Sequence, residues 1–441
     1  MIFDLIIKNG TLVNHAGIGG GDIGIIGGKI AAIGDLLAQS AAQIIDAKGL
    51  HILPGIIDSQ VHFREPGLEW KEDLETGANA AVLGGVTSVF EMPNTNPTTS
   101  TIDDLQEKVR RATGRMSCDF AFYAGATGEN TGQLAELERE IGCAGIKVFM
   151  GASTGKLLVK DDVSVGQILQ NINRRAAFHC EDEYILEQRR ELARFDDPTS
   201  HHEVRNEEAA LNCTKRLIRL AREHKKRVHV LHISTASEMH FLKDHKDLET
   251  IEVLPNHLSF TAPDIYEKIG TLGQQNPPIR EQHHQDALWA AIANGLVDVI
   301  GSDHAPHTLA EKAKPYPTSP SGTPGVQTML PVMLTHVANG RLSLLRLVDL
   351  LCHGPQRIFG LVNKGRMALG FDADFTIVDI KQKRIIQNDW IASKSQWTPF
   401  HGFEATGWPT HTIVRGNIVM ANGEIIGRGL GKPLEFLENL K

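Results

Sequence analysis

Side chains that can hold a divalent metal recur at the ends of short apolar runs. The candidates are Asp58, Gln60 and His62 after ILPGII, His179 at the end of RAAFHC, His232 at the end of VHVLHIS, and Asp303 at the end of VDVIGSD. Imidazole nitrogens and carboxylate oxygens suit zinc, and a catalytic zinc site leaves a coordination position open for water. One such histidine alone is more often a hydrogen-bonded structural residue, and a lone aspartate can cap a helix. Their recurrence at the ends of separate predicted strands indicates a metal site.

Lys147 is a lysine inside the apolar run GIKVFM. Its ammonium could extend to water at the end of a strand, or it could take part in the same site. Five other histidines fall in predicted helices or loops, and we expect them at the surface: His201, His202, His224, His283 and His284.

Residues 55–370 alternate short apolar runs with polar, helix-like stretches. GVTSVFEM and DFAFYAG are two of the runs, and NEEAALNCTKRLIRLAREH carries apolar residues at helical spacing. Repeated units of this kind predict an α/β fold, with a parallel sheet and helices outside it. An open doubly wound sheet is the alternative. We favour a closed (β/α)8 barrel of the TIM type because the polar candidates end many strands, where barrel enzymes place their chemistry.

The two ends of the chain differ from its middle. Residues 1–54 and 371–441 consist of short predicted strands separated by turns, with Asn-Gly pairs at Asn9–Gly10 and Asn422–Gly423 that predict hairpins. We expect both ends to form one small β-sandwich domain beside a metal-dependent catalytic barrel at 55–370. Residues 310–325 are rich in Pro, Ser and Gly and predict a loop, which either closes over a substrate or is a surface connection.

The composition of the 441 residues excludes several classes of function. Lys and Arg number 45 against 53 Asp and Glu, and this net charge of −8 argues against nucleic acid as a partner. No apolar run approaches the roughly 20 residues that cross a membrane, and no signal peptide is visible. Five dispersed cysteines without a CxxC pair fit a reducing compartment. We expect a cytoplasmic enzyme that acts on a small molecule and forms a homo-oligomer, a dimer.

The order of the polar motifs resembles that of the dihydroorotases, in the cyclic amidohydrolase group of the amidohydrolase superfamily. The motifs are PGIIDSQVHFREPG, EMPNTNP, GIKVFM, FHCED, VLHIST, LPNHL, QNPPIRE and GSDHAPH. Allantoinase-like sequences typically have Asn where this chain has Arg64, and hydantoinase-like sequences lack the FREPG block. The resemblance implies a zinc-dependent (β/α)8 barrel that reversibly hydrolyses dihydroorotate to N-carbamoyl-L-aspartate in pyrimidine biosynthesis. An amidohydrolase acting on another cyclic amide or ureide is an alternative.

The resemblance also implies roles for individual residues. Arg64, Asn94 and Asn276 would hold the substrate carboxylate, which suits the paired hydrogen bonds of a guanidinium, and His307 would reach the substrate. The implied metal ligands are His62, Lys147, His179, His232 and Asp303, around one or two zinc ions. Lys147 would be carboxylated, and its carbamate would bridge two metals about 3.5–4 Å apart. Asp303 would accept the proton of the metal-activated water and pass it to the departing ring nitrogen.

Gln60 departs from the family pattern. Dihydroorotases have His-x-His where this chain has Gln60-Val61-His62, and an amide oxygen is a poorer zinc ligand than imidazole. Three outcomes remain open: a one-metal enzyme, a two-metal enzyme with Gln60 as a weak ligand, and a non-catalytic relative. Reduced or one-metal catalysis ranks first because the other site residues are in place. The non-catalytic alternative is a subunit that scaffolds aspartate transcarbamoylase.

Overall fold

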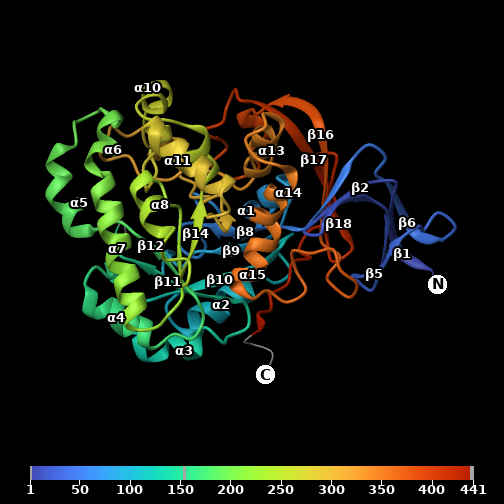
Figure 1. The fold of residues 1–441 in the computed structure, drawn as a ribbon, viewed down its shortest axis with the longest axis horizontal. Coiled ribbons are helices and arrows are strands. Elements are labelled where there is room, and N and C mark those ends of the chain that lie inside the picture. The colour runs from blue at the N-terminus through green and yellow to red at the C-terminus, as the bar shows by residue number, and fades with distance from the viewer. Residues whose placement is uncertain (1, 152–154, 438–441) are drawn as a thin grey trace.

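A closed barrel of parallel strands occupies the middle of the chain (Figure 1). The computed structural model describes residues 2–151 and 155–437. Neighbours in the eight-stranded sheet follow chain order from β8 to β15. The sheet closes through a bridge between Val61 and His304, where the His62 amide donates to the carbonyl oxygen of His304 at 2.7 Å. The barrel strands are β8 (Ile56–Val61), β9 (Val86–Glu91), β10 (Asp119–Gly125), β11 (Cys143–Phe149), β12 (Ala176–His179), β13 (Val228–Val230), β14 (Glu249–Val253) and β15 (Val299–Ile300). The expected barrel is confirmed, and the open sheet is not.

Helices connect successive strands and cover the outside of the barrel (Figure 1). Ion pairs and caps mark their ends; α2, for example, begins with a capping box formed by Thr101 and Asp104. The helices are α1 (Leu74–Leu83), α2 (Ile102–Ala112), α3 (Leu134–Leu137), α4 (Asp162–Gln170), α5 (Glu183–Arg189), α6 (His201–Val204), α7 (Glu207–Glu223), α8 (Ala236–Leu242), α9 (Pro255–Ser259), α10 (Asp264–Ile269), α11 (Gln282–Ala293), α12 (Leu309–Lys312), α13 (Met329–Ala338), α14 (Leu344–Val348) and α15 (Gly354–Phe359). No helix in the described ranges is long and apolar enough to cross a membrane.

The run ILPGII forms parts of two strands rather than one. β7 (His51–Pro54) belongs to a sheet outside the barrel, and β8 begins after Gly55. A Cβ on Gly55 would lie 2.4 Å from Thr87 Oγ1, so only glycine fits at this change of sheet. The expectation that Asp58 and Gln60 follow the strand was therefore wrong, because both lie within β8.

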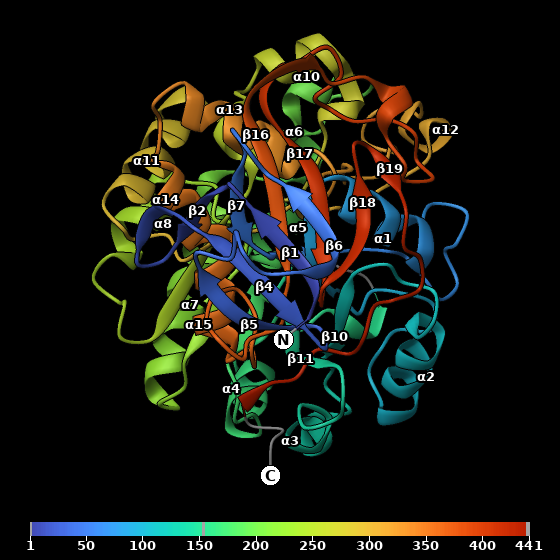
Figure 2. The same ribbon diagram turned by 90° about the vertical axis from the view of Figure 1, so that its right-hand side faces the viewer.

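Strands from both ends of the chain lie side by side in a smaller β-rich part (Figure 2). One sheet has the order β5-β4-β1-β6, and the other has the order β19-β18-β17-β16-β7-β2-β3. The strands not yet given are β1 (Phe3–Lys8), β2 (Thr11–Asn14), β3 (Gly17–Gly20), β4 (Asp22–Ile26), β5 (Lys29–Gly34), β6 (Ala41–Asp46), β16 (Phe375–Ile385), β17 (Glu404–Val414), β18 (Asn417–Ala421) and β19 (Glu424–Ile425). The second sheet joins both termini, as expected. The boundaries at residues 54 and 371 stay a prediction, and residues 438–441 of the second segment lie outside the described residues.

Candidate active site

Asp303 connects Gln60 in the first barrel strand with His62 just after it, at the carboxyl-terminal mouth of the barrel. Its Oδ1 lies 3.0 Å from His62 Nε2 and accepts a hydrogen bond of 3.0 Å from Gln60 Nε2. His62 follows β8 directly, whereas Asp303 lies three residues beyond β15. The closure of the barrel between β8 and the segment after β15 thus brings these three side chains together.

A second group at the mouth is formed by His179 and His232. Nδ1 of His179 and Nε2 of His232 lie 2.9 Å apart, and both rings are buried. On its other side, His179 Nε2 lies 2.8 Å from Glu181 Oε2. Burial works to raise the pKa of Glu181, but Arg205 and His179 hold it well below its ordinary value. Glu181 is therefore a carboxylate that accepts from His179 Nε2 and leaves the Nδ1 lone pair facing His232.

Lys147 lies in β11 with its amine enclosed. Its side chain is 1% exposed, and Nζ has no hydrogen-bond partner among the described residues. Nζ is 4.5 Å from the centre of the Phe149 ring. Burial lowers the pKa of this amine to about 7, against the opposing charges of Asp303 and Glu252. With a pKa near 7, a substantial fraction of this buried lysine is the neutral amine. A neutral amine can act as a nucleophile, which an ordinary ammonium cannot.

Several buried polar atoms at the mouth lack partners within the described part of the chain. They are Gln60 Oε1, Lys147 Nζ, His232 Nδ1 and Asp58 Oδ2. Buried polar atoms are seldom left unpaired in folded proteins, because each costs free energy. Together with the facing nitrogens of His179 and His232, this set of nitrogen and oxygen donors fits a divalent cation.

A cationic group lies beside these residues. Arg64 Nε donates to the carbonyl oxygen of Pro306 at 3.2 Å, and Arg64 Nη2 lies 3.4 Å from His307 Nε2. Lys71 Nζ donates to His307 Nδ1 at 3.0 Å, and His307 Nε2 lies 3.0 Å from the carbonyl oxygen of Ser321. Burial, then the charges of Arg64 and Lys71, lower the pKa of His307 far below its ordinary value. His307 is neutral, and Lys71 is also paired with Glu311 at 3.1 Å. Arg64 forms no ion pair among the described residues, so its guanidinium is the cation placed to bind a carboxylate.

The two candidate asparagines are both held by histidines. Asn94 Oδ1 lies 2.7 Å from His62 Nδ1, so this asparagine orients a histidine of the first group. Asn276 Oδ1 lies 3.1 Å from His201 Nε2, which also lies 2.9 Å from the carbonyl oxygen of Gln275. His201 and His284 were expected at the surface, and this was wrong, since they are only 4% and 3% exposed. Each ring packs between elements and forms a hydrogen bond with the backbone, of Gln275 and Ala236 respectively.

Three residues of the mouth adopt left-handed backbone conformations that side chains other than glycine seldom take. Their φ angles are 65° for Arg64, 37° for His232 and 46° for Asp303. Such conformations cost free energy of roughly 1–3 kcal/mol each and concentrate at functional sites. The mouth is thus a strained region that the rest of the barrel holds in place.

Hydrogen bonds fix the loop of residues 310–325 beside the mouth. Lys312 Nζ is buried and donates to the carbonyl oxygens of Gln274, Pro320 and Gly322 at 3.0, 2.9 and 3.2 Å. A Cβ on Gly322 would lie 2.4 Å from the Ala305 carbonyl oxygen and 3.0 Å from His307 Nε2. The loop therefore forms a wall beside His307 in this conformation.

Three side chains at the mouth were not singled out from the sequence: Glu181, Lys71 and Arg205. Glu181 stands two residues after His179 in FHCED, and Lys71 stands seven residues after Arg64, so proximity in sequence was the available signal. Two other groups of potential metal ligands lie outside the mouth: Glu207 with His283 and His284, and Asp119 with Asp372 and Asp374. In the second group Lys364 already supplies the cation.

Comparison with known proteins gives relatives over the whole length. Residues 51–419 match the model of the Amidohydrolase family. A dihydroorotase of Methanothermobacter thermautotrophicus is 35% identical over 98% of each chain, and an allantoinase of Deinococcus radiodurans is 32% identical over 98% of this chain and 99% of its own. The solved structure of an L-hydantoinase (dihydropyrimidinase) from Arthrobacter aurescens has a TM-score of 0.94 at 32% identity, covering 98% of this chain and 99% of its own.

Proposed function

The chain belongs to the amidohydrolase family, as a dihydroorotase-like hydrolase of cyclic amides, and from this premise we propose that its substrate is dihydroorotate. The reaction is the reversible opening of the ring to N-carbamoyl-L-aspartate, a step of pyrimidine biosynthesis. Relatives named hydantoinase and allantoinase match this chain at a similar degree of identity. The choice among these substrates therefore depends on the site itself.

The observation that carries the proposal is the pair of cations around His307. Dihydroorotate has a carboxylate on its ring, whereas allantoin and simple hydantoins have none. Arg64 can bind a carboxylate through two parallel hydrogen bonds, and Lys71, which is shared with Glu311, lies on the other side of His307. Asn276, held by His201, is proposed as a further donor to this carboxylate, and the amide nitrogen of Asn94, whose Oδ1 faces His62, as another.

The unpaired atoms at the mouth support a divalent metal, which we propose to be zinc. When bound, the metal lowers the pKa of a coordinated water toward neutrality and polarises the amide carbonyl. The residues that would hold it are His62, Lys147, His179, His232 and Asp303, with Gln60 as a weak ligand through Oε1. The pKa of Lys147, near 7, leaves enough neutral amine to react with carbon dioxide, so we propose that this lysine is carboxylated.

Asp303 is proposed as the general acid and base. Its Oδ1 accepts hydrogen bonds from Gln60 and lies against His62, so its position at the mouth is fixed. From there it can accept a proton from the attacking water and deliver it to the ring nitrogen as the amide bond breaks. His179 is kept in one tautomer by Glu181, which holds its Nδ1 unprotonated.

Gln60 supports an enzyme with one tightly held metal. His179, His232 and Lys147 retain their full donor set, while the group of His62 and Asp303 has an amide in place of one imidazole. A two-metal enzyme remains a second candidate because Gln60 Oε1 is buried and has no hydrogen-bond partner among the residues that the structure describes. The mass of the purified protein in solution tests whether the chain forms a homodimer. Co-purification tests whether it associates with aspartate transcarbamoylase.

One experiment tests the function directly. The purified chain is assayed for metal per chain and for hydrolysis of dihydroorotate, hydantoin and allantoin in parallel. We expect about one zinc per chain and a kcat/KM for dihydroorotate at least tenfold above the other two substrates. Preference for hydantoin or allantoin would reassign the substrate. The proposal would be contradicted if the protein held no metal and hydrolysed none of the three substrates, with or without the transcarbamoylase.

A further inference from the structure

A second pocket lies at the opposite end of the barrel from the mouth. Its lining comes from the segments that precede β12 and β13, from the start of β11 and from the residues at and after the end of α15. These are amino-terminal ends of barrel strands, whereas the mouth is formed by their carboxyl ends. The pocket has a volume of about 570 Å³, within the range of sites that bind small molecules.

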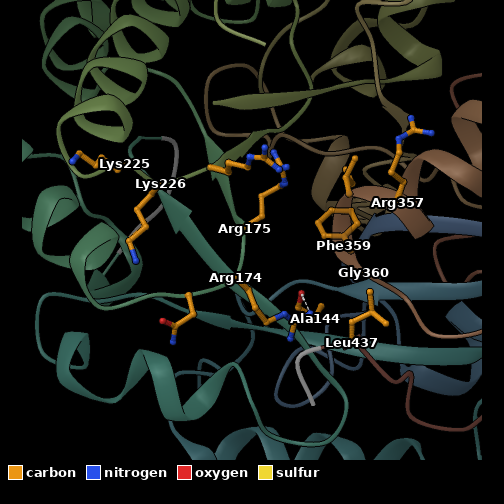
Figure 3. Close-up of a pocket in the computed structure, with 12 residues that line it drawn as sticks. Ala144, Arg174, Arg175, Lys225, Lys226, Arg357, Phe359, Gly360 and Leu437 are labelled. Carbon is orange, nitrogen blue, oxygen red and sulfur yellow. Dashed lines mark hydrogen bonds between the residues drawn. The ribbon is translucent and has the colours of Figure 1, made fainter. Parts of the chain in front are cut away.

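The lining of this pocket is strongly basic. Of the twelve described residues that line it, six are Lys or Arg and none is Asp or Glu: the cations are Arg174, Arg175, Lys225, Lys226, Arg227 and Arg357. The chain as a whole has more acidic than basic residues, 53 against 45. Figure 3 shows Lys225 and Lys226 on one side, Arg175 in the middle and Arg357 beyond Phe359 on the other side. Such a concentration of one charge is not explained by the average composition of the surface.

The central cation, Arg175, is positioned by neutral groups. Its Nη1 donates to the carbonyl oxygen of Val228 at 3.1 Å and to Thr250 Oγ1 at 3.2 Å. Burial lowers the pKa of Arg175, and the charge of Arg227 lowers it further. The guanidinium is thus fixed in place next to another positive charge, an arrangement that costs free energy until an anion binds.

Lys225, Lys226 and Arg227 lack acidic partners within the part of the chain that the structure describes. Lys226 Nζ donates to the carbonyl oxygen of Ile172, and within the described ranges neither Lys225 nor Arg227 forms an ion pair. Arg357 pairs with Asp349 at 3.3 Å, so this end of the pocket is partly neutralised. Asp298 and Glu249 oppose part of the charge of Arg175 from outside the lining. Among the described residues the uncompensated charge is therefore centred on Lys225, Lys226 and Arg227, next to Arg175.

We propose that this pocket binds an oligophosphate, either inorganic or carried by a nucleotide. Guanidinium groups bind phosphate oxygens through paired hydrogen bonds, and a chain of phosphates supplies several negative charges within one small volume. A single carboxylate would leave most of the cations unneutralised. Phe359 is only 5% exposed, so it offers no open face for a base to stack on, and recognition rests on the phosphates. This inference does not depend on the proposed substrate.

The test is calorimetric titration of the purified full-length protein with sodium tripolyphosphate, at constant ionic strength. ATP in a parallel titration separates a nucleotide from a free oligophosphate, and sodium sulfate measures the response to a simple dianion. We expect saturable binding of tripolyphosphate or ATP at least tenfold tighter than that of sulfate. Binding of all three at equal strength, or of none, would overturn the proposal.

Two matched variants locate the binding. Lys225 has a φ of 54°, and asparagine tolerates this conformation, so the pocket variant is Lys225→Asn with Arg227→Gln. The control removes two exposed lysines elsewhere, Lys48→Gln with Lys381→Gln, for the same change in net charge. We expect the pocket variant to weaken tripolyphosphate binding at least tenfold and the control less than twofold. Equal losses of binding in the two variants would contradict binding at this pocket. Unchanged hydrolysis of the cyclic amide by both variants would show that the pocket variant is folded and has lost binding alone.

Discussion

Gln60 is the residue on which the chemistry of the mouth most depends. Its amide donates to Asp303 and leaves Oε1 buried without a partner in the described part of the chain. An imidazole at this position would present a better ligand to a divalent metal than an amide oxygen does. The side chain therefore preserves the position of Asp303 and would weaken one part of the proposed metal site.

We predict that Gln60→His raises the metal content. The measurement is metal per chain by elemental analysis after purification in buffer with equimolar zinc, with an expected rise toward two ions. Gln60→Asn, which keeps an amide but shortens the side chain, is the control and should leave the content at or below that of the unchanged protein. An unchanged content in Gln60→His would count against a role for this position in binding metal.

We predict that Arg64→Lys lowers kcat/KM for dihydroorotate by roughly 10–100-fold, because the ammonium lacks the fork that binds a carboxylate. Turnover of hydantoin, which has no carboxylate, should fall less than fivefold. Arg110→Lys, on an exposed turn of α2, serves as the control and should change neither rate. Equal losses for both substrates would show that Arg64 acts on the fold of the mouth rather than on the carboxylate.

That His62, His179, His232 and Asp303 would lie together at the mouth could be predicted at this scale, because each stands at or just after the end of an apolar run. The residues that orient them could not. Glu181 holds His179, and His201 holds Asn276 from a helix 75 residues earlier in the chain. Such contacts depend on which loops meet above the barrel, and a single sequence does not contain that information. His201 looked like a surface residue because its neighbours in sequence are polar.

At the scale of elements, the dipeptide Asn-Gly forms a hairpin turn at one of its two predicted positions and not at the other. Asn422 and Gly423 both have positive φ angles, 52° and 84°, and join the paired strands β18 and β19 in the hairpin that was expected. At Asn9–Gly10 only Asn9 has a positive φ, 62°, and the flanking strands β1 and β2 belong to different sheets. The hairpin expected there was wrong, because the chain uses the turn to change sheets.

β14 is a strand that the apolar pattern did not reveal. Its sequence ETIEV contains two glutamates, Glu249 and Glu252, that are 1% and 0% exposed. Buried carboxyl groups are rare unless they are paired or protonated. Burial raises the pKa of each to about 8, so both are largely protonated at neutral pH and fit a buried strand.

Glu249 makes the stability of this strand depend on pH. A carboxyl group with a raised pKa binds its proton more tightly in the folded state, so its contribution is present below the ordinary value of 4.5 and lost as the pH rises toward about 8. We predict that Glu249→Gln has a thermal midpoint close to that of the unchanged protein at pH 5 and a higher one at pH 8.5. Glu404→Gln, at an exposed carboxylate, should show no such divergence. Parallel midpoints for Glu249→Gln would contradict the burial argument.

Gly67 sets the distance between two loops of the mouth. Its φ is 86°, and a Cβ would lie 1.8 Å from the carbonyl oxygen of Asn96. We predict that Gly67→Ala separates the loops that carry Arg64 and Asn94 and lowers kcat/KM at least tenfold. Gly423→Ala is the control, since its φ of 84° imposes the same strain with nothing within 4 Å of the new Cβ. It should cost about 1 kcal/mol of stability and leave activity unchanged.

At the scale of the whole molecule, a buried lysine joins the barrel to the β-rich part. Lys364 Nζ lies 2.5 Å from Asp119 at the start of β10, 2.9 Å from Asp372 and 2.6 Å from Asp374 just before β16. Burial opposes its charge, but the three carboxylates hold the pKa of Lys364 above its ordinary value. The barrel and the terminal sheets could each be predicted from local patterns, whereas this junction joins residues about 250 positions apart that no local pattern connects.

The last prediction concerns this junction. Lys364→Met would remove the cation that contacts all three carboxylates, leaving Arg415 beside Asp119 and the half-exposed Lys29 beside Asp372. Removal of one partner from a buried ionic group costs roughly 3–5 kcal/mol. Lys29→Met removes another lysine from Asp372, but Lys29 is 45% exposed, so its loss should cost no more than about 1 kcal/mol. The check is the thermal midpoint of both variants at pH 7.5 and pH 5. The deficit of Lys364→Met should shrink at the lower pH, where protonation of the crowded carboxylates relieves their repulsion. A deficit that is equal in the two variants, or independent of pH, would mean that packing and not this charged junction holds the two parts together.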